Sequence, residues 1–316
     1  MNAVADPMRA VVIERIGPPD VLAATTLPTP APGPGEVLVA VQAAAVNAID
    51  WKTRAGRGVS LGEFPALLGW DVSGEVVARG PVANRFAPGD PVFGMLRFPR
   101  LAGTYAEFVT APEAELAPRP SDLSPVAAAG TMCGLTAWES LFDHGGLQAG
   151  QRVLVHGGAG GVGHVAVQLA RSVDAEVIAT ASPRNADFLH DLGATEVVDY
   201  GSTDLEKTAT GVDLVLDTRG GQDFHRLLPT LRSGGTIVTL LGEAPDHRIA
   251  AAARDVRVAH THVAPHKARL AELGAAIGDG RVRLNVDAMF TLDQAAAAHE
   301  LGEQGHVRGL LALTVD

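Results

Sequence analysis

The chain has 316 residues, of which 47% are hydrophobic and 19% charged, and its formal net charge is −11 at pH 7. This length predicts about two domains with a sizeable core, and the excess of acidic residues argues against nucleic acid or an anionic membrane surface as a partner. The single cysteine, Cys133, excludes an intramolecular disulfide. We find neither a signal peptide nor an apolar stretch long enough to span a bilayer, so a cytoplasmic protein is expected.

After a short N-terminal tail, segments up to residue 117 alternate polar and apolar residues between Pro and Gly turns, which is typical of an all-β unit. Its strands are predicted at 8–13, 37–43, 72–78 and 106–110. From residue 124 strands alternate with helical patterns, which predicts a doubly wound parallel sheet. The predicted strands are 152–156, 177–181, 196–200, 214–217, 236–241 and 256–262, with helices that include 163–172 and 222–231. The chain ends with a predicted strand at 283–290, helix at 292–300 and strand at 309–315.

The segment 151–171 combines a strand, a glycine turn and an amphipathic helix. Gly158, Gly160 and Gly163 fit the G-x-G-x-x-G pattern of a dinucleotide site. The first glycine permits a tight turn, the second lets backbone N–H groups approach a pyrophosphate, and the third packs helix on strand. The positive end of the helix then faces the phosphates. The predicted cofactor loop is Gly158, Ala159, Gly160, Gly161, Val162 and Gly163.

The end of the second predicted strand distinguishes between the two nicotinamide cofactors. An enzyme that uses NAD normally places Asp or Glu there to hold the ribose 2′-hydroxyl. This chain has Ser182-Pro183-Arg184-Asn185 instead. A hydroxyl and a guanidinium suit a 2′-phosphate, which a carboxylate would repel. Ser182 and Arg184 therefore predict NADPH as the cofactor.

Several separate segments resemble the zinc-free medium-chain dehydrogenases/reductases of the quinone oxidoreductase group. These segments are 44–52, 64–74, 103–109, 134–138, the glycine loop and 305–309, and the resemblance covers 8–315. It implies an α/β protein: a GroES-like catalytic β domain made from residues 1–122 and 265–316, and a doubly wound Rossmann NADPH-binding domain at 123–264. The resemblance also implies substrate binding in the cleft, and a homodimer in which the last Rossmann strand, around 256–262, pairs with its twofold mate.

Zinc-dependent relatives hold their metal with Cys, His and Cys, and the matching positions here are Asn47, Trp70 and Met132. None of these side chains is a competent zinc ligand. Cys133 lies beside the third position, but one thiolate cannot hold a metal, and a buried packing role is expected for it. The 11 histidines form no metal pattern in the sequence. We therefore expect no metal.

Without a metal to lower a hydroxyl pKa, oxidation of a simple alcohol is unfavourable, whereas a quinone or an α,β-unsaturated carbonyl accepts hydride readily. Asn47 is the catalytic candidate for orienting the nicotinamide ribose or the substrate oxygen, and Asp50 for fixing its loop. The alternative is a structural turn whose side chains bond only their own backbone. Some enoyl reductases of this superfamily use a tyrosine in this region as proton donor. None occurs at 47–51, and Tyr105 falls in a segment with a structural family role, so protonation by solvent is expected.

The resemblance implies cofactor contacts outside the glycine loop as well. Their positions are Asn47, Thr131, Thr136, Tyr200, Leu240, Leu241, Gly242 and Arg308. The sequence thus favours an NADPH-dependent reductase of quinones or activated α,β-unsaturated carbonyl compounds that acts without metal. Two alternatives stay open: a biosynthetic enoyl reductase on a polyketide-like intermediate, and a non-catalytic NADPH-binding sensor or crystallin-like protein, because a fold alone does not establish activity.

Overall fold

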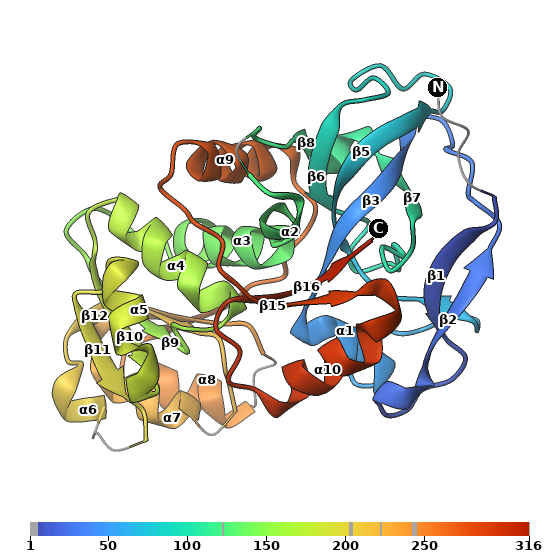
Figure 1. The fold of residues 1–316 in the computed structure, drawn as a ribbon. Helices are drawn as coiled ribbons and strands as arrows, with labels where there is room; N and C mark the ends of the chain where they lie inside the picture. Colours follow the sequence, from blue (N-terminus) through green and yellow to red (C-terminus); the bar gives the residue numbers. More distant parts are fainter. Residues whose placement is uncertain (1–5, 122, 202–204, 222, 242–244, 316) are drawn as a thin grey trace. The chain divides into compact units, whose positions relative to one another are not determined.

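The computed structural model describes residues 6–121, 123–201, 205–221, 223–241 and 245–315. The chain, traced in Figure 1, divides into two compact units. The first comprises Met1–Met132, Ala264–Asp279 and Leu284–Asp316, and the second comprises Cys133–Val263 and Gly280–Arg283. The domain boundaries expected at 122/123 and 264/265 stay predictions. No helix in the described part of the chain is long and apolar enough to cross a membrane.

The second unit is built on a six-stranded sheet with the order β11-β10-β9-β12-β13-β14, and each neighbouring pair is parallel. The strands are β9 (Arg152–His156), β10 (Glu176–Ala181), β11 (Glu196–Asp199), β12 (Val212–Asp217), β13 (Leu231–Thr239) and β14 (Arg257–His260). This is the doubly wound order: β10 and β11 are added on one side of β9, and β12, β13 and β14 are added on its other side. Ligands bind such sheets at the carboxyl ends of the strands near this change of side.

The helices of this unit connect its parallel strands. They are α4 (Gly161–Ser172), α5 (Ala186–Asp191), α6 (Leu205–Thr208), α7 (Asp223–Leu227) and α8 (Pro245–Ala252), preceded by α3 (Thr131–Trp138) and the π-helix η3 (Glu139–His144). Short 3-10 turns are η4 (Pro183–Asn185) and η5 (Leu228–Thr230). Right-handed crossovers place α4 and α5 on one face of the sheet and α7 and α8 on the other. Both faces are therefore covered, and the central strands are rich in buried Val, Leu and Ile residues.

The first unit is mainly antiparallel β structure and joins the two ends of the chain. A three-stranded sheet has the order β2-β1-β4, with β1 (Met8–Ile13), β2 (Leu22–Leu27) and β4 (Ala66–Leu67). A seven-stranded sheet has the order β15-β16-β3-β5-β6-β8, with β7 paired to β3. Its strands are β3 (Glu36–Val46), β5 (Asp71–Arg79), β6 (Pro91–Met95), β7 (Phe108–Pro112), β8 (Leu116–Pro118), β15 (Val286–Thr291) and β16 (Leu310–Thr314). The C-terminal strand β16 lies antiparallel to β3, so both chain ends build one sheet.

The helices of the first unit are short and pack around these sheets. They are α1 (Ala48–Arg54), α2 (Pro125–Ala128), α9 (Lys267–Gly278) and α10 (Ala295–Gln304), with 3-10 turns η1 (Pro19–Val21), η2 (Glu113–Glu115) and η6 (Leu292–Gln294). Leu292, Ala295 and Ala298 of η6 and α10 are buried in the same core cluster as β1 and β16 residues. The segment expected to be all β, up to residue 117, also contains the helix α1, whereas η6 and α10 correspond to the helix expected at 292–300.

Some predicted elements differ from the observed ones at their ends. The helix expected at 222–231 is shorter, since α7 ends at Leu227 and Leu231 already begins β13. Pro229 lies between them and lacks the N–H that an α-helix needs, so the chain continues only as the turn η5. The strand expected at 283–290 begins at Val286, and the one expected at 106–110 begins at Phe108.

Candidate active site

The loop that joins β9 to α4 is tied to the neighbouring strand β10 through backbone groups. The Gly157 N–H donates to Thr180 Oγ1 at 3.0 Å, and the Gly158 N–H donates to the Thr180 carbonyl oxygen at 2.9 Å. Gly157 has φ +81°, a left-handed conformation that favours glycine. The tight turn that the motif assigns to Gly158 is thus made by the residue before it.

The three motif glycines are required for different reasons. A Cβ at Gly163 would lie 2.3 Å from the Gly157 carbonyl oxygen, and one at Gly158 would lie 2.8 Å from the Ala179 Cβ. Packing within the protein therefore excludes side chains at both positions. At Gly160, by contrast, the described chain brings only the Gly157 oxygen near a Cβ, at 3.5 Å, and φ is −79°. Neither packing nor backbone conformation demands glycine there, and the open space fits a pyrophosphate.

The first turn of α4 provides donors beside this space. Gly160 is the N-cap residue of α4, and no side chain at this position accepts a hydrogen bond from the first turn of the helix. Phosphate oxygens commonly accept hydrogen bonds from such backbone N–H groups. His164 supports the turn from within, because its Nδ1 lies 3.0 Å from the Gly160 carbonyl oxygen. Burial lowers the pKa of His164 to about 4, so this imidazole is neutral at physiological pH.

The carboxyl edge of the parallel sheet collects more of the predicted cofactor residues. Ser182 and the exposed Arg184 follow β10 directly, and Tyr200 follows β11, the strand paired with β10. The Arg219 guanidinium, after β12, lies over the Tyr200 ring at 5.5 Å from the ring centroid. The motif analysis missed Arg219, although its place directly after a parallel strand was an available signal. The edge thus presents two guanidinium groups where an anionic cofactor is expected.

The predicted carboxamide contacts follow β13 at the same edge. The Leu240 N–H donates to the Asp217 carbonyl oxygen at 3.1 Å, and the Leu241 N–H donates to Thr239 Oγ1 at 3.3 Å. Gly242, the third predicted residue, lies outside the described residues. These contacts define the local backbone, and the cofactor role of the segment stays a prediction.

Thr131, Thr136 and Arg308 are also predicted to contact the cofactor. Thr136 is buried in α3, and Thr131 at the start of the same helix donates from Oγ1 to the Ala128 carbonyl oxygen at 3.3 Å. Arg308 lies before β16 in the first unit, where its N–H donates to Asp287 Oδ2 at 3.1 Å. Thr131 and Arg308 thus belong to the first unit and Thr136 to the second. Their predicted cofactor contacts stay predictions.

In the first unit, Asn47 is held from two directions by buried carboxyl groups. Its backbone N–H donates to Asp50 Oδ2 at 2.8 Å, and its Nδ2 donates to Asp71 Oδ2 at 3.0 Å. The second oxygen of each carboxyl group accepts a backbone N–H, from Gly69 to Asp50 at 3.1 Å and from Met132 to Asp71 at 2.8 Å. Asp50 therefore holds the backbone at Asn47 and Asp71 orients the Asn47 amide, while the catalytic roles of Asn47 and Asp50 stay predictions. Sequence analysis did not identify Asp71.

Both carboxyl groups have unusual protonation behaviour because they are fully buried. Burial raises the pKa of Asp50 to about 7, although hydrogen bonds from the Asn47 and Gly69 backbone oppose the shift. Burial also raises the pKa of Asp71 well above its usual range, against hydrogen bonds from Asn47 and Met132. The two groups repel each other when both are ionised, so the cluster favours retaining a proton.

A further buried network lies on the other side of Asp50. The Tyr105 hydroxyl forms a hydrogen bond with the Asp50 side chain and lies 3.2 Å from His299 Nε2. Arg54, only 1% exposed, donates from Nη2 to Glu303 at 2.6 Å. Burial raises the pKa of Tyr105 well above its usual range and lowers that of His299 to about 3. Tyr105 is thus close to Asp50 in space, although the sequence placed it in a separate segment.

The residues at the positions of the zinc ligands in zinc-dependent relatives make other contacts in this chain. The buried Trp70 donates its indole N–H to the Arg100 carbonyl oxygen at 2.7 Å. Met132 and Cys133 are both buried, and the Asn47 amide bonds Asp71. The donor chemistry of Asn47, Trp70 and Met132 does not fit a zinc ion.

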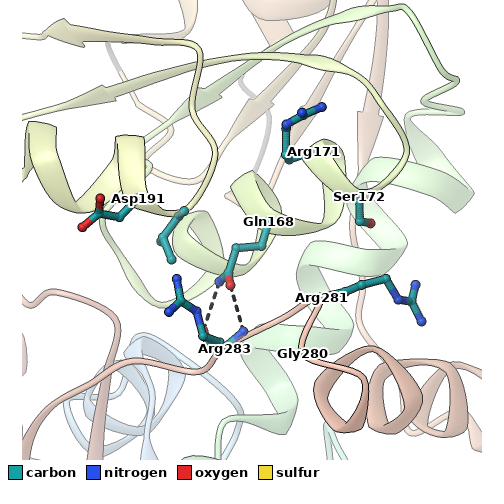
Figure 2. Close-up of a pocket in the computed structure, with 8 residues that line it drawn as sticks. Gln168, Arg171, Ser172, Asp191, Gly280, Arg281 and Arg283 are labelled. Atoms are coloured by element: carbon teal, nitrogen blue, oxygen red, sulfur yellow. Dashed lines mark hydrogen bonds between the residues drawn. The ribbon is translucent and has the colours of Figure 1, made fainter.

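A pocket of about 260 Å³ lies on the second unit away from the glycine loop. It is lined by Gln168, Arg171, Ser172, Asp191, Leu192, Gly280, Arg281 and Arg283. The Gln168 side chain bridges the backbone of Arg283, accepting its N–H at 2.8 Å and donating to its carbonyl oxygen at 3.0 Å. Figure 2 shows the guanidinium groups of Arg171, Arg281 and Arg283 pointing in different directions, so they do not converge on one ligand. We therefore do not assign the cofactor or the acceptor to this pocket.

Comparison with known proteins agrees with this architecture. A family model described as "Alcohol dehydrogenase GroES-like domain" matches residues 33–121, and one described as "Zinc-binding dehydrogenase" matches residues 192–313. The chain is 34% identical to NAD(P)H oxidoreductase RTN4IP1, mitochondrial, from Danio rerio over 98% of this chain and 91% of the relative. The solved quinone oxidoreductase from Coxiella burnetii shares 36% identity with a TM-score of 0.92, covering 98% of this chain and 100% of that one.

The chain belongs to the quinone oxidoreductase group of the medium-chain dehydrogenases/reductases. This confirms the family inferred from the sequence and the fold class of a GroES-like β domain with a Rossmann domain. The names of similar proteins state different cofactors and substrates. One similar solved structure is titled NAD-dependent alcohol dehydrogenase, at 33% identity and a TM-score of 0.91 over 98% of this chain and 100% of that chain. Family membership thus indicates a nicotinamide-dependent oxidoreductase, and this chain's own residues must distinguish the cofactor and the acceptor.

Proposed function

We propose that this chain is an NADPH-dependent reductase that transfers hydride, without metal, to a quinone or an activated α,β-unsaturated carbonyl compound. The observation that carries the proposal is the end of β10, where Ser182 and the exposed Arg184 stand beside the glycine loop. An arginine at this point suits the 2′-phosphate of NADPH, and a carboxylate would be needed for the 2′-hydroxyl of NADH. The open space at Gly160 suits the pyrophosphate of the same cofactor.

In the proposed reaction, bound NADPH supplies the hydride. Asn47 orients the acceptor oxygen or the nicotinamide ribose, and its amide cannot rotate freely because Asp71 binds its Nδ2. An electron-poor acceptor needs no Lewis acid, since conjugation spreads the incoming charge. The hydride carries two electrons and one proton to the acceptor, and solvent supplies the second proton. Tyr105 is fully buried with its hydroxyl bonded inside the protein, so we assign it no proton transfer to substrate.

The proposal is tested by following the absorbance of reduced nicotinamide with the purified protein. We expect steady loss of NADPH with a simple quinone or enone, slower loss with NADH, and little reduction of NADP⁺ by simple alcohols. Preference for an enoyl thioester over every quinone and enone would favour the biosynthetic enoyl reductase. NADPH binding without turnover on any acceptor would favour the sensor, and robust alcohol oxidation would contradict the proposal.

We also propose a homodimer formed through β14, with the cytoplasm as the expected compartment. β14 is the last strand of the six-stranded sheet and pairs only with β13 among the described strands, which leaves one edge for a second copy. Light scattering should give twice the mass of the chain. A monomer at micromolar concentration would contradict the proposed dimer.

A further inference from the structure

Three potential metal ligands meet between α7 and α8, outside the residues assigned to cofactor or acceptor. They are His225 on α7 and Asp246 and His247 on α8, and one ligand atom from each lies within 4.8 Å of the others. His225 Nε2 lies 2.9 Å from Asp246 Oδ2. The two histidines are far apart in the sequence, which explains why spacing showed no metal pattern. The fold brings them together because the helices after β12 and β13 lie side by side on one face of the sheet.

The His247 ring is held in place by the core of the second unit. It stacks on Phe224, with ring centroids 4.0 Å apart and an interplanar angle of 6°, and Phe224 itself is 1% exposed. Stacking uses the faces of the imidazole, whereas a metal binds a ring nitrogen in the ring plane. The His225 ring lies edge-to-face with His247 at 5.3 Å. Packing therefore orients the His247 ring before any ligand binds, which reduces the ordering that binding requires.

We propose that His225, Asp246 and His247 bind one divalent transition-metal cation of the zinc class, at a site separate from hydride transfer. Ligands of a tetrahedral zinc ion lie about 2.1 Å from the metal and hence about 3.4 Å from each other. Donor atoms already within 4.8 Å of one another reach this arrangement by small side-chain rotations. Two imidazoles with one carboxylate suit Zn²⁺, Co²⁺ or Ni²⁺ and disfavour Mg²⁺ and Ca²⁺. Water would complete the coordination.

Charge at the site also favours a cation. Asp246 supplies a carboxylate, the anionic member of the ligand set, and its Oδ2 lies 2.9 Å from His225 Nε2. A bound cation would link α7 to α8 through three side chains, so it should raise the thermal stability of the second unit.

The experiment uses tag-free full-length protein, stripped with chelator and dialysed, and titrated with ZnCl₂ in a calorimeter without nicotinamide or acceptor. We expect one Zn²⁺ per chain. His225→Ala and Asp246→Asn should each weaken binding by at least about tenfold. Both side chains are exposed, so these variants should fold, which circular dichroism checks. Because no activity is measured, the result does not depend on the proposed reductase function.

Two controls identify the site. The His190→Ala variant removes an exposed histidine of the same unit, and the double variant His260→Ala/His262→Ala removes the other neighbouring pair, whose rings lie 6.3 Å apart. Both controls should bind Zn²⁺ as the wild type does. The proposal is overturned if the wild type shows no saturable binding, if His225→Ala and Asp246→Asn bind normally, or if binding disappears only in the double variant.

Discussion

Asn47, which is itself buried, is held in place by two buried carboxyl groups. Asp50 binds its backbone N–H and Asp71 binds its amide, and both carboxyl groups are completely buried. This arrangement is typical of a residue whose direction matters, because burying two carboxyl groups costs free energy that a simple turn does not require. The functional interpretation of Asn47 and the structural interpretation of Asp50 are therefore compatible.

Removal of the amide should separate catalysis from cofactor binding. Asn47→Ala is expected to lower kcat for quinone reduction by about tenfold to a hundredfold while NADPH affinity changes little, because a misplaced reacting centre costs rate more than binding. Asp71→Asn should have a smaller effect in the same direction, since one amide oxygen replaces two carboxylate oxygens. Steady-state kinetics and NADPH titration measure both quantities. Full activity in Asn47→Ala would show that other groups orient the acceptor.

The proposed preference for NADPH depends on Arg184. Arg184→Ala should weaken NADPH binding by about 1–3 kcal/mol, the range for hydrogen bonds to a charged group, and leave NADH binding nearly unchanged. Fluorescence titration with each cofactor measures the difference. Arg171→Ala, which removes another exposed arginine of the same unit, serves as the matched control. Equal losses for both cofactors in Arg184→Ala would refute the assignment.

Asp50 makes stability depend on pH in a direction opposite to that of most carboxyl groups. Its pKa is raised from 3.8 to about 7, so folding favours the protonated form. The stabilisation is complete below about pH 4 and is lost as pH rises through about 7. Between pH 5 and 8 the unfolding free energy of the wild type should therefore fall relative to Asp50→Asn, by on the order of 3 kcal/mol. Urea unfolding at several pH values measures this, and a relative rise would contradict it.

Among the glycines between β9 and α4, the fold requires Gly158 and Gly163, whereas Gly160 borders open space that a ligand could occupy. Gly163→Ala should lower the unfolding free energy by about 1–3 kcal/mol, because its Cβ would meet the Gly157 carbonyl oxygen at 2.3 Å. Gly160→Ala should change stability by no more than about 1 kcal/mol yet weaken NADPH at least about tenfold, since the methyl group enters the space assigned to the pyrophosphate. Denaturant unfolding and cofactor titration test the pair. Normal NADPH affinity in Gly160→Ala would place the pyrophosphate elsewhere.

For the whole molecule, the metal-free reaction and the proposed zinc site require separate tests. Quinone reduction by the wild type should survive chelator treatment, because Asn47, Trp70 and Met132 supply no zinc ligand set. Purified His225→Ala protein should contain no stoichiometric zinc by elemental analysis. Zinc retained in that variant, together with activity lost on chelation, would indicate a catalytic metal and overturn the reaction proposed here.

Local patterns in the sequence predicted much of the architecture. Apolar strands, glycine spacing and Pro/Gly turns depend on neighbours in the chain, so the parallel strands, α4 and the Gly158–Gly163 loop were recognisable from the sequence. Ser182 and Arg184 were found as candidates in the same way, because the residues that follow this Rossmann strand commonly contact the cofactor ribose, and their role stays a prediction. Element ends were less accurate, as Pro229 shows, since they depend on individual backbone donors.

Only the tertiary structure revealed Asp71 beneath Asn47, Tyr105 against Asp50, Arg219 over Tyr200, and His225 beside Asp246. Each pair joins residues distant in sequence, brought together by strand pairing or by helices that pack on one face of a sheet. No local pattern encodes such proximity. The burial that raises the pKa of Asp50 likewise arises from side chains contributed by several elements. The sequence by itself determined the family and the fold and predicted the cofactor loop, whereas tertiary packing decided which polar groups lie in contact and therefore which of them are charged.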